Sequence, residues 1–496
     1  MKIFFHTLMV STALLLSFTA CSNDKGNYDY ISENKLIPVE ISVMDSVSVK
    51  ANSLLSITPT VKNDDKSRYK YTWYTIAKNW PHKCDTLSTK HDLSLNCNLN
   101  AGEYTLYYQV KDSLKNIYKY VSAPLTVTAT DINSGWYVMK ERNGTTDVDY
   151  YSMSGTARPN LFTDVMGISP LVGSPVGMAY APSCYNQEVN NPDGSVTKLY
   201  QQSVFHIVST KDMITLNASD MGVFKRLSEE FYEQPSTFNF QAIAVDGLST
   251  QTLLNNGQMH NLLGFMGGIG KFSFQKEGNF NFYPQIISAD YDDYVYDQKS
   301  SSMYASDMFS GLVQCTNSKG STIFSDSSFV MLNFMPRVDY SYMASAYAVF
   351  KGGLKNKYYV AAISLFDVYL NPTDPVFTEI PSTCGLLSTD VMAAPRNASV
   401  IYFAKDNMLK LFKVATISEE MLKTFDVGEK VTFIKNISGT NADKTTFNDL
   451  VVITNSSTGY KVYRFPLVGS AGEINATSSA VMTGTGAASF IMFRQN

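Results

Sequence analysis

The chain has 496 residues, which is too long for one small hydrophobic core, so two or more domains are expected. Its formal net charge is −4 and it contains no cluster of Lys and Arg, which argues against nucleic acid as a partner. Aromatic residues make up 13% of the chain, with 31 Tyr but only 3 Trp, and stretches with helical periodicity are nearly absent. This composition predicts an all-β protein.

The first residues of the chain have the pattern of a leader peptide. Residues 8–20 form an apolar run that is too short to span a bilayer but is typical of a signal peptide. The sequence Phe18-Thr19-Ala20-Cys21 resembles a bacterial lipobox, with Phe18 in place of the usual Leu. We therefore predict a signal peptide over 1–20, lipid on Cys21 and a flexible tether over 21–34, which places the protein on the outer membrane facing outward. The alternative is an ordinary secretory cleavage site with an incidental cysteine.

Residues 35–130 alternate in short stretches separated by turns. Tyr69, Tyr71 and Trp73 fall on one face of one such stretch, and a second begins at Tyr104 after the turn at Gly102. Several short strands in so few residues, with a Trp midway, predict an immunoglobulin-like sandwich that has Trp73 in its core.

Four segments carry a family resemblance. They are the start of the mature chain, 21–30 (CSNDKGNYDY), then 69–74 (YKYTWY), 87–95 (LSTKHDLSL) and 101–112 (AGEYTLYYQVKD). Together they resemble the PKD-like domain of Bacteroidota lipoproteins. The resemblance implies a sandwich fold and a surface lipoprotein of a Sus-type nutrient-uptake locus, without a catalytic site or a cofactor. It also implies a TonB-dependent transporter and its lid lipoprotein as partners, and a protein that either binds glycan or peptide or shapes the importer complex.

Six cysteines occur, and none forms a CxxC pair. With Cys21 lipidated, Cys84 and Cys97 are the closest pair. A disulfide between them would contribute about 3 kcal/mol by restricting the unfolded chain. The alternative is two free, buried thiols.

After a linker at 131–134, residues 135–496 repeat a loose hairpin unit in which an apolar strand, a polar turn and a second apolar strand follow one another. The units are 135–139 with 148–151, 204–208 with 213–216, 251–254 with 258–260, 294–296 with 302–304, 358–361, 400–403 with 408–412, and 450–453 with 460–465. They predict a seven-bladed β-propeller. The last apolar segment, 489–494, would pair with 135–139 and close the ring. A stack of separate β-sandwiches is the alternative.

Candidate ligand contacts are few. Trp80 lies in a turn, and Tyr291, Asp292 and Tyr294 belong to an acidic and aromatic loop that suits surface calcium or sugar, or is merely solvated. The loop misses the EF-hand pattern, and we predict no metal site. His206 and His260 fall inside strand patterns, where packing is the simpler role. Two long inserts, 154–200 and 307–353, are rich in Tyr, Asn and Phe.

No HExxH, GxSxG or Walker motif is present in the sequence. We therefore favour a non-catalytic binding protein over an enzyme. The alternatives are a propeller enzyme acting on extracellular glycan or peptide, and a structural or adhesive spacer.

Overall fold

A computed structural model describes residues 36–495, except 44, 51–52, 79–81, 83, 98, 100–101, 129–131, 133, 191–195, 290–291, 308–310, 317–328, 338–344, 353–356, 365–373, 390, 397, 470 and 477–478. The predicted signal peptide, Cys21 and the tether lie outside the described residues. So do Trp80 and Tyr291.

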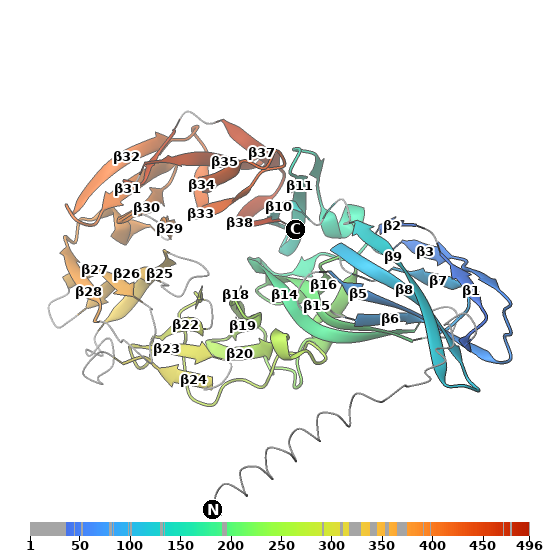
Figure 1. Ribbon diagram of the computed structural model, residues 1–496. Coiled ribbons are helices and arrows are strands. Elements are labelled where there is room, and N and C mark those ends of the chain that lie inside the picture. The colour runs from blue at the N-terminus through green and yellow to red at the C-terminus, as the bar shows by residue number, and fades with distance from the viewer. Residues whose placement is uncertain are drawn as a thin grey trace, which may run out of the picture.

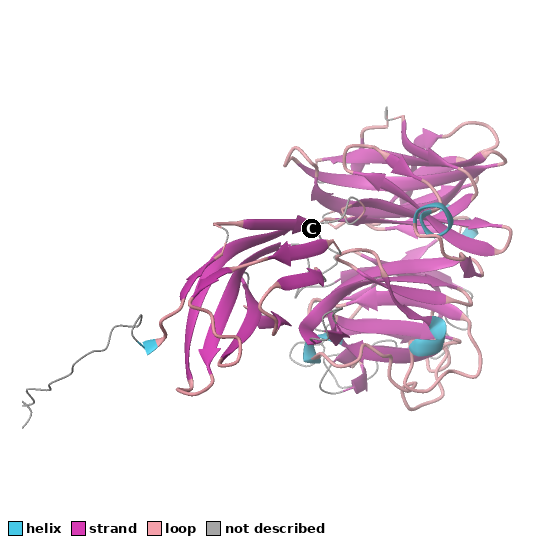
Figure 2. Ribbon diagram, turned by 90° about the vertical axis from the view of Figure 1, so that its right-hand side faces the viewer, coloured by secondary structure: helices cyan, strands magenta, loops and turns pink. Residues whose placement is uncertain are grey.

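Residues 40–128 form a sandwich around one hydrophobic core (Figures 1 and 2). Its strands are β1 (Glu40–Ser42), β2 (Val47–Lys50), β3 (Leu54–Ile57), β4 (Thr60–Lys62), β5 (Tyr69–Ala77), β6 (Cys84–Ser88), β7 (Leu93–Asn96), β8 (Gly102–Asp112) and β9 (Ile117–Thr128). One sheet has the order β2-β9-β8-β5-β6, and the pairs β1-β4 and β3-β7 complete the fold. Trp73 is fully buried, as predicted, and its indole N–H donates to the carbonyl of His91 at 3.1 Å.

The rest of the described chain forms seven antiparallel sheets, which stand around a ring as the blades of a propeller (Figure 1). The first is built from β10 (Gly135–Arg142), β11 (Thr145–Ser152), β12 (Ala157–Arg158), β13 (Leu171–Val172) and β38 (Ala487–Arg494). The second contains β14 (Pro175–Asn190), β15 (Val196–Ser209), β16 (Met213–Asn217) and β17 (Val223–Arg226), and the third β18 (Phe240–Val245), β19 (Thr250–Asn255) and β20 (Gln258–Leu263).

The fourth blade contains β21 (Ile287–Ser288), β22 (Asp292–Asp297), β23 (Ser302–Asp307) and β24 (Gly311–Gln314), and the fifth β25 (Val330–Pro336), β26 (Ser345–Gly352), β27 (Lys357–Ser364) and β28 (Val376–Ile380). The sixth contains β29 (Val391–Ala393), β30 (Val400–Lys405), β31 (Met408–Lys413) and β32 (Ser418–Thr424). The seventh contains β33 (Lys430–Thr440), β34 (Thr446–Ser456), β35 (Gly459–Val468), β36 (Glu473–Ile474) and β37 (Ala480–Gly484). Short helical turns are η1 (Leu161–Val165), η2 (Leu227–Glu229), η3 (Gly264–Met266) and η4 (Gly385–Ser388).

The C-terminal strand closes the ring as predicted. β38 pairs antiparallel with β10 from Gly135 opposite Arg494 to Glu141 opposite Ala487. The first blade therefore combines strands from both ends of the propeller sequence. This pairing occupies the strand edge that an open ring would leave exposed.

The hairpin β14–β15 is much longer than its blade and reaches the sandwich (Figure 1). Irregularities in its register near Ala181 and Tyr185 interrupt the ladder, and such bulges bend a strand. Beyond the bend, β15 packs against β6, the edge strand of the five-stranded sheet. Leu199 of this arm is 1% exposed and belongs to the sandwich core.

Cys84 and Cys97 are free cysteines, so the structure does not contain the predicted disulfide. Cys84 is exposed at the start of the edge strand β6, whereas Cys97 follows β7 of the other layer and is buried in the core. The two cysteines therefore lie in different layers of the sandwich.

Because Leu199 fills the sandwich core from outside the sandwich sequence, shortening it should destabilise the sandwich. We expect Leu199→Ala to lower the free energy of unfolding by about 2–5 kcal/mol, as for other buried leucines. Leu114, which is 80% exposed, offers the matched control Leu114→Ala. Urea unfolding followed by tryptophan fluorescence measures both variants. Equal effects of the two substitutions would show that the arm does not support the core.

The cysteine arrangement predicts a labelling pattern. With Cys21 replaced, a maleimide should modify Cys84 in the native protein and reach the four buried thiols only after unfolding. Mass spectrometry of the labelled chain counts the additions. An unfolded, unreduced chain that accepts only three labels would instead establish a disulfide.

Candidate functional site

Asp292 and Tyr294, which were predicted to lie in an acidic and aromatic loop, belong instead to strand β22. Tyr294 is 1% exposed and packs among buried residues of β22 and its neighbours, with its hydroxyl donating to Asp292 at 3.3 Å. Asp292 is partly buried. A ligand on the surface cannot stack on the Tyr294 ring, so the structure does not support the prediction of a contact there.

The neighbouring Asp293 belongs to a buried polar cluster between the third and fourth blades. Its carboxylate accepts hydrogen bonds from the hydroxyls of Ser288 and Thr252. Asp246, which follows β18, accepts from the backbone N–H groups of Leu248 and Thr250 at 2.9 and 2.7 Å. Burial raises the pKa of both carboxyls, and the charge of Asp246 raises that of Asp293 further. One proton shared by Asp246 and Asp293 relieves the repulsion between their two carboxylates.

A second buried cluster lies between the second and third blades. Its members are Cys184, His206, Thr215, Glu230 and Gln251, each at most 1% exposed. The imidazole of His206 lies 2.8 Å from the Thr215 hydroxyl and 2.6 Å from the Gln251 carbonyl oxygen. Thr215 lies 2.6 Å from Glu230, and the Cys184 thiol donates to Gln251 at 3.5 Å.

The hydrogen bonds of this cluster show which nitrogen of His206 carries a proton. The Gln251 oxygen can only accept, so His206 Nε2 carries a proton. Burial lowers the pKa of His206 to about 4 and raises the pKa of Glu230. The Thr215 hydroxyl donates to Glu230 Oε1. Burial also raises the pKa of Cys184 to about 12, so the thiol is not a nucleophile here.

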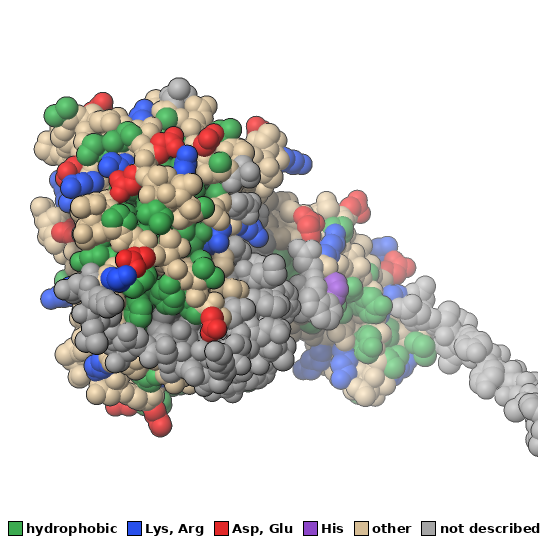
Figure 3. Space-filling view, turned by 90° about the vertical axis from the view of Figure 1, so that its left-hand side faces the viewer, with side chains coloured by type: hydrophobic (Ala, Val, Ile, Leu, Met, Phe, Trp, Pro, Cys, Tyr) green, Lys and Arg blue, Asp and Glu red, His purple; other side chains and the backbone are tan. Residues whose placement is uncertain are grey.

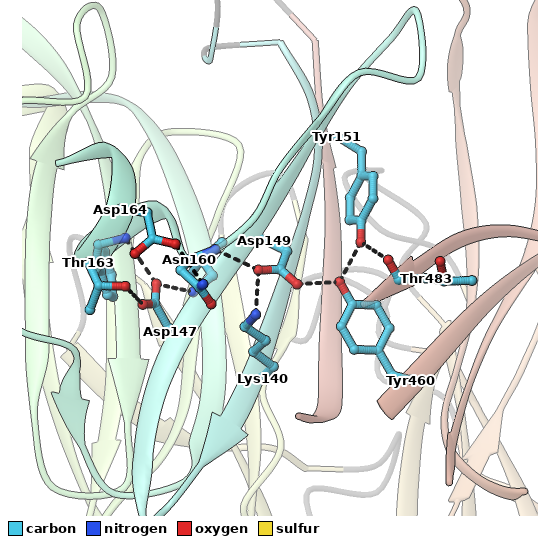
Figure 4. Close-up of polar contacts among 11 residues, drawn as sticks. Lys140, Asp147, Asp149, Tyr151, Asn160, Thr163, Asp164, Tyr460 and Thr483 are labelled. Carbon is cyan, nitrogen blue, oxygen red and sulfur yellow. Dashed lines mark hydrogen bonds and ion pairs between the residues drawn. The ribbon is translucent and has the colours of Figure 1, made fainter. Parts of the chain in front are cut away.

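The third polar cluster joins the first and last blades (Figure 4). Lys140 of β10 forms an ion pair with Asp149 of β11 at 2.7 Å, and both side chains are almost fully buried. The other oxygen of Asp149 accepts from Tyr460 of β35 at 2.7 Å. Tyr151 lies 2.7 Å from Tyr460 and donates to the Thr483 carbonyl. Burial, and then the charge of Asp149, raise the pKa of Tyr460, which keeps its proton for this bond.

The exposed candidate is the outer face of the five-stranded sandwich sheet. Tyr74 of β5 and Tyr107 of β8 stack with ring centroids 4.8 Å apart, and Tyr120 of β9 meets Tyr107 at 6.0 Å. Tyr118 and Tyr120 are 60% and 54% exposed. By contrast, the described part of the propeller rim seen in Figure 3 intersperses acidic and basic side chains without a patch of one sign.

The described residues contain neither a cluster of metal ligands nor a membrane-spanning helix. Within them, no group of three or more His, Cys, Asp or Glu side chains is placed to bind a metal ion. His206 and His260 are both buried and hydrogen-bonded, as structural histidines are. No helix of the described chain has the length and apolar character needed to cross a membrane.

The N-terminal third of the chain is similar to a known family. Residues 21–174 match the PKD-like family. The match begins at the predicted lipidated cysteine and extends past the sandwich through β13 of the first blade. No curated protein matches the chain.

Several solved structures resemble the chain at low similarity. A streptogramin B lyase shares 9% identity with a TM-score of 0.34, over 64% of this chain and 92% of the lyase. Virginiamycin B lyase from Staphylococcus aureus shares 9% identity with a TM-score of 0.37, over 68% and 97%. A chain of the mitotic checkpoint complex shares 10% identity with a TM-score of 0.32, over 62% and 81%. Similarity at this level does not bear on activity.

The raised pKa of Asp293 predicts a pH effect on stability. The native state holds a proton that the unfolded state releases near pH 4, so stability falls as pH rises from about 4 toward neutrality. Asp293→Asn removes this titration, and its urea midpoint should fall less between pH 5 and pH 8 than that of the parent. The exposed Asp374 offers the control Asp374→Asn, which should behave as the parent does. An unchanged pH dependence in Asp293→Asn would contradict the assignment.

Proposed function

We propose that this chain is a lipid-anchored protein of the outer cell surface that binds extracellular glycan or peptide, as a non-catalytic accessory of a Sus-type, TonB-dependent nutrient importer. The observation that carries the binding role is the tyrosine-rich outer face of the sandwich, where Tyr118 and Tyr120 are exposed and Tyr74 and Tyr107 are half-buried. Tyrosine is an amphipathic side chain with few rotamers, so it contributes contact area at a small entropic cost.

The leader supports the proposed location. The lipobox-like sequence ends at Cys21, and the PKD-like match starts at the same residue. A lipid on Cys21 followed by the polar residues 22–34 would hold the sandwich near the membrane surface. The importer as partner rests on the resemblance to lipoproteins of nutrient loci.

The architecture suits a protein that holds a binding face in a fixed orientation. The arm β14–β15 places Leu199 in the sandwich core. The propeller therefore contacts the sandwich through this arm as well as through the short linker. A binding face held in this way loses little orientational freedom when a partner docks.

The competing hypothesis, a propeller enzyme, requires an acid, base or nucleophile that a substrate can reach. The described groups with strongly shifted pKa values include Cys184, His206, Glu230 and Asp293, and each is at most 1% exposed. Their hydrogen bonds run to one another and to strand residues, which suits polar packing between blades. The binding role is therefore the better supported of the two.

The anchor and the partner can be tested together. Cys21→Ala should move the protein from the outer-membrane fraction to the soluble fraction. The native protein, extracted in mild detergent, should retain a TonB-dependent transporter and its lid lipoprotein. Membrane retention of Cys21→Ala would overturn the anchor. Recovery of the native protein alone, with turnover of a glycan or peptide by the pure chain, would favour the enzyme.

A further inference from the structure

The outward positions of the sandwich sheet form a regular lattice. Residues directly opposite each other on paired strands point to the same face. Across β5, β8 and β9 the first row is Lys70, Lys111 and Tyr118, the second is Thr72, Gln109 and Tyr120, and the third is Tyr74, Tyr107 and Ser122. The lattice alternates with the buried positions that carry Trp73 and Tyr108, so its orientation is fixed by the core.

Two like charges face each other in this lattice. Lys70 and Lys111 are exposed and lie directly opposite on neighbouring strands, an arrangement that destabilises a sheet. No carboxylate occupies a position in the three rows. Of the outward residues of β8, only Glu103 is acidic, and it lies at the far end of the strand beside Lys78 and Thr126. The face therefore carries uncompensated positive charge.

The remaining lattice positions provide aromatic rings and neutral polar groups. Tyrosine rings pack against the C–H faces of sugars, while their hydroxyls and the side chains of Thr72, Gln109 and Ser122 offer hydrogen bonds. A ligand that satisfies rings, hydroxyls and lysines at once has C–H faces, many hydroxyls and negative charge. A polysaccharide with carboxylate or sulfate groups has all three.

A peptide fits this surface less well. Extended peptides bind sheets by adding a strand to a free edge, where the main chain supplies the hydrogen bonds. The β6 edge of this sheet is packed against the arm strand β15. The opposite edge strand, β2, has only four residues. The lattice therefore offers its face to a ligand, where side-chain contacts dominate.

The geometry points to an anionic polysaccharide as the ligand of the face formed by these three rows. This inference rests on the proposed binding role and names the class of ligand. The retained Lys70–Lys111 pair lowers stability in the free protein and is offset when the bound chain supplies its carboxylates or sulfates. Binding should weaken as salt rises, because the charges are exposed.

The test uses the full mature chain with Cys21→Ala, by affinity electrophoresis in gels that contain polygalacturonate, dextran or poly-L-glutamate. We expect retardation by polygalacturonate alone. The pair Lys70→Ala with Lys111→Ala should weaken it about tenfold, which corresponds to 1.4 kcal/mol. Tyr118→Ala with Tyr120→Ala should weaken it similarly. The controls Lys66→Ala with Lys211→Ala, and Tyr232→Ala, alter exposed residues outside the lattice and should leave it unchanged.

A stability measurement separates loss of binding from damage to the fold. Removing opposed like charges should leave the melting temperature unchanged or raise it, while binding falls. Equal retardation by dextran or poly-L-glutamate, no retardation by polygalacturonate, or equal losses in the controls would each overturn the inference. If the native protein still copurifies with a transporter in that case, the importer role stands without this ligand. If polygalacturonate binds but no transporter copurifies, the ligand inference stands and the importer role fails.

Discussion

The pairing of β38 with β10 is the contact on which the rest of the structure depends. It joins residues separated by almost the whole propeller sequence, so the ring of seven sheets is closed where the two ends meet. Such a long-range contact carries a loop-closure entropy that local hairpins do not. The buried Lys140, Asp149 and Tyr460 lie at the same junction (Figure 4). Because an unpaired buried charge is strongly unfavourable, this cluster tolerates only the register in which all its partners meet.

The arm extends this closed ring to the sandwich. Leu199 enters the sandwich core only because β14 and β15 continue past their blade and bend. The same contact covers the edge strand β6, which would otherwise offer unpaired backbone groups to another chain. One hairpin thus joins the two modules and covers a sheet edge at which another chain could pair.

The sequence was informative where a strand has a strong local pattern. The central hairpins of most blades were predicted from their apolar runs, because β10 and β11 are nearly all buried and β34 has a continuous buried stretch in its middle. Inner strands escaped notice because they are short or partly exposed, as in β18 and β29. The predicted inserts 154–200 and 307–353 contain such strands, including β14 and β25. The cluster from Cys184 to Gln251 could not be predicted, because only the blade packing brings these distant residues together.

The two modules use their polar residues in opposite ways. In the propeller, Glu230, Asp293 and Lys140 are enclosed and contact polar neighbours, and the bond from Thr252 to Asp293 joins the third blade to the fourth. On the sandwich, Lys70 and Lys111 face each other in solvent, and tyrosines fill the adjacent rows. Removing a partner from the first kind of site leaves a buried polar group unpaired, whereas removing a lysine from the second relieves repulsion. Like charges that lower stability are expected where function requires them, so this surface is the one for which we propose a ligand.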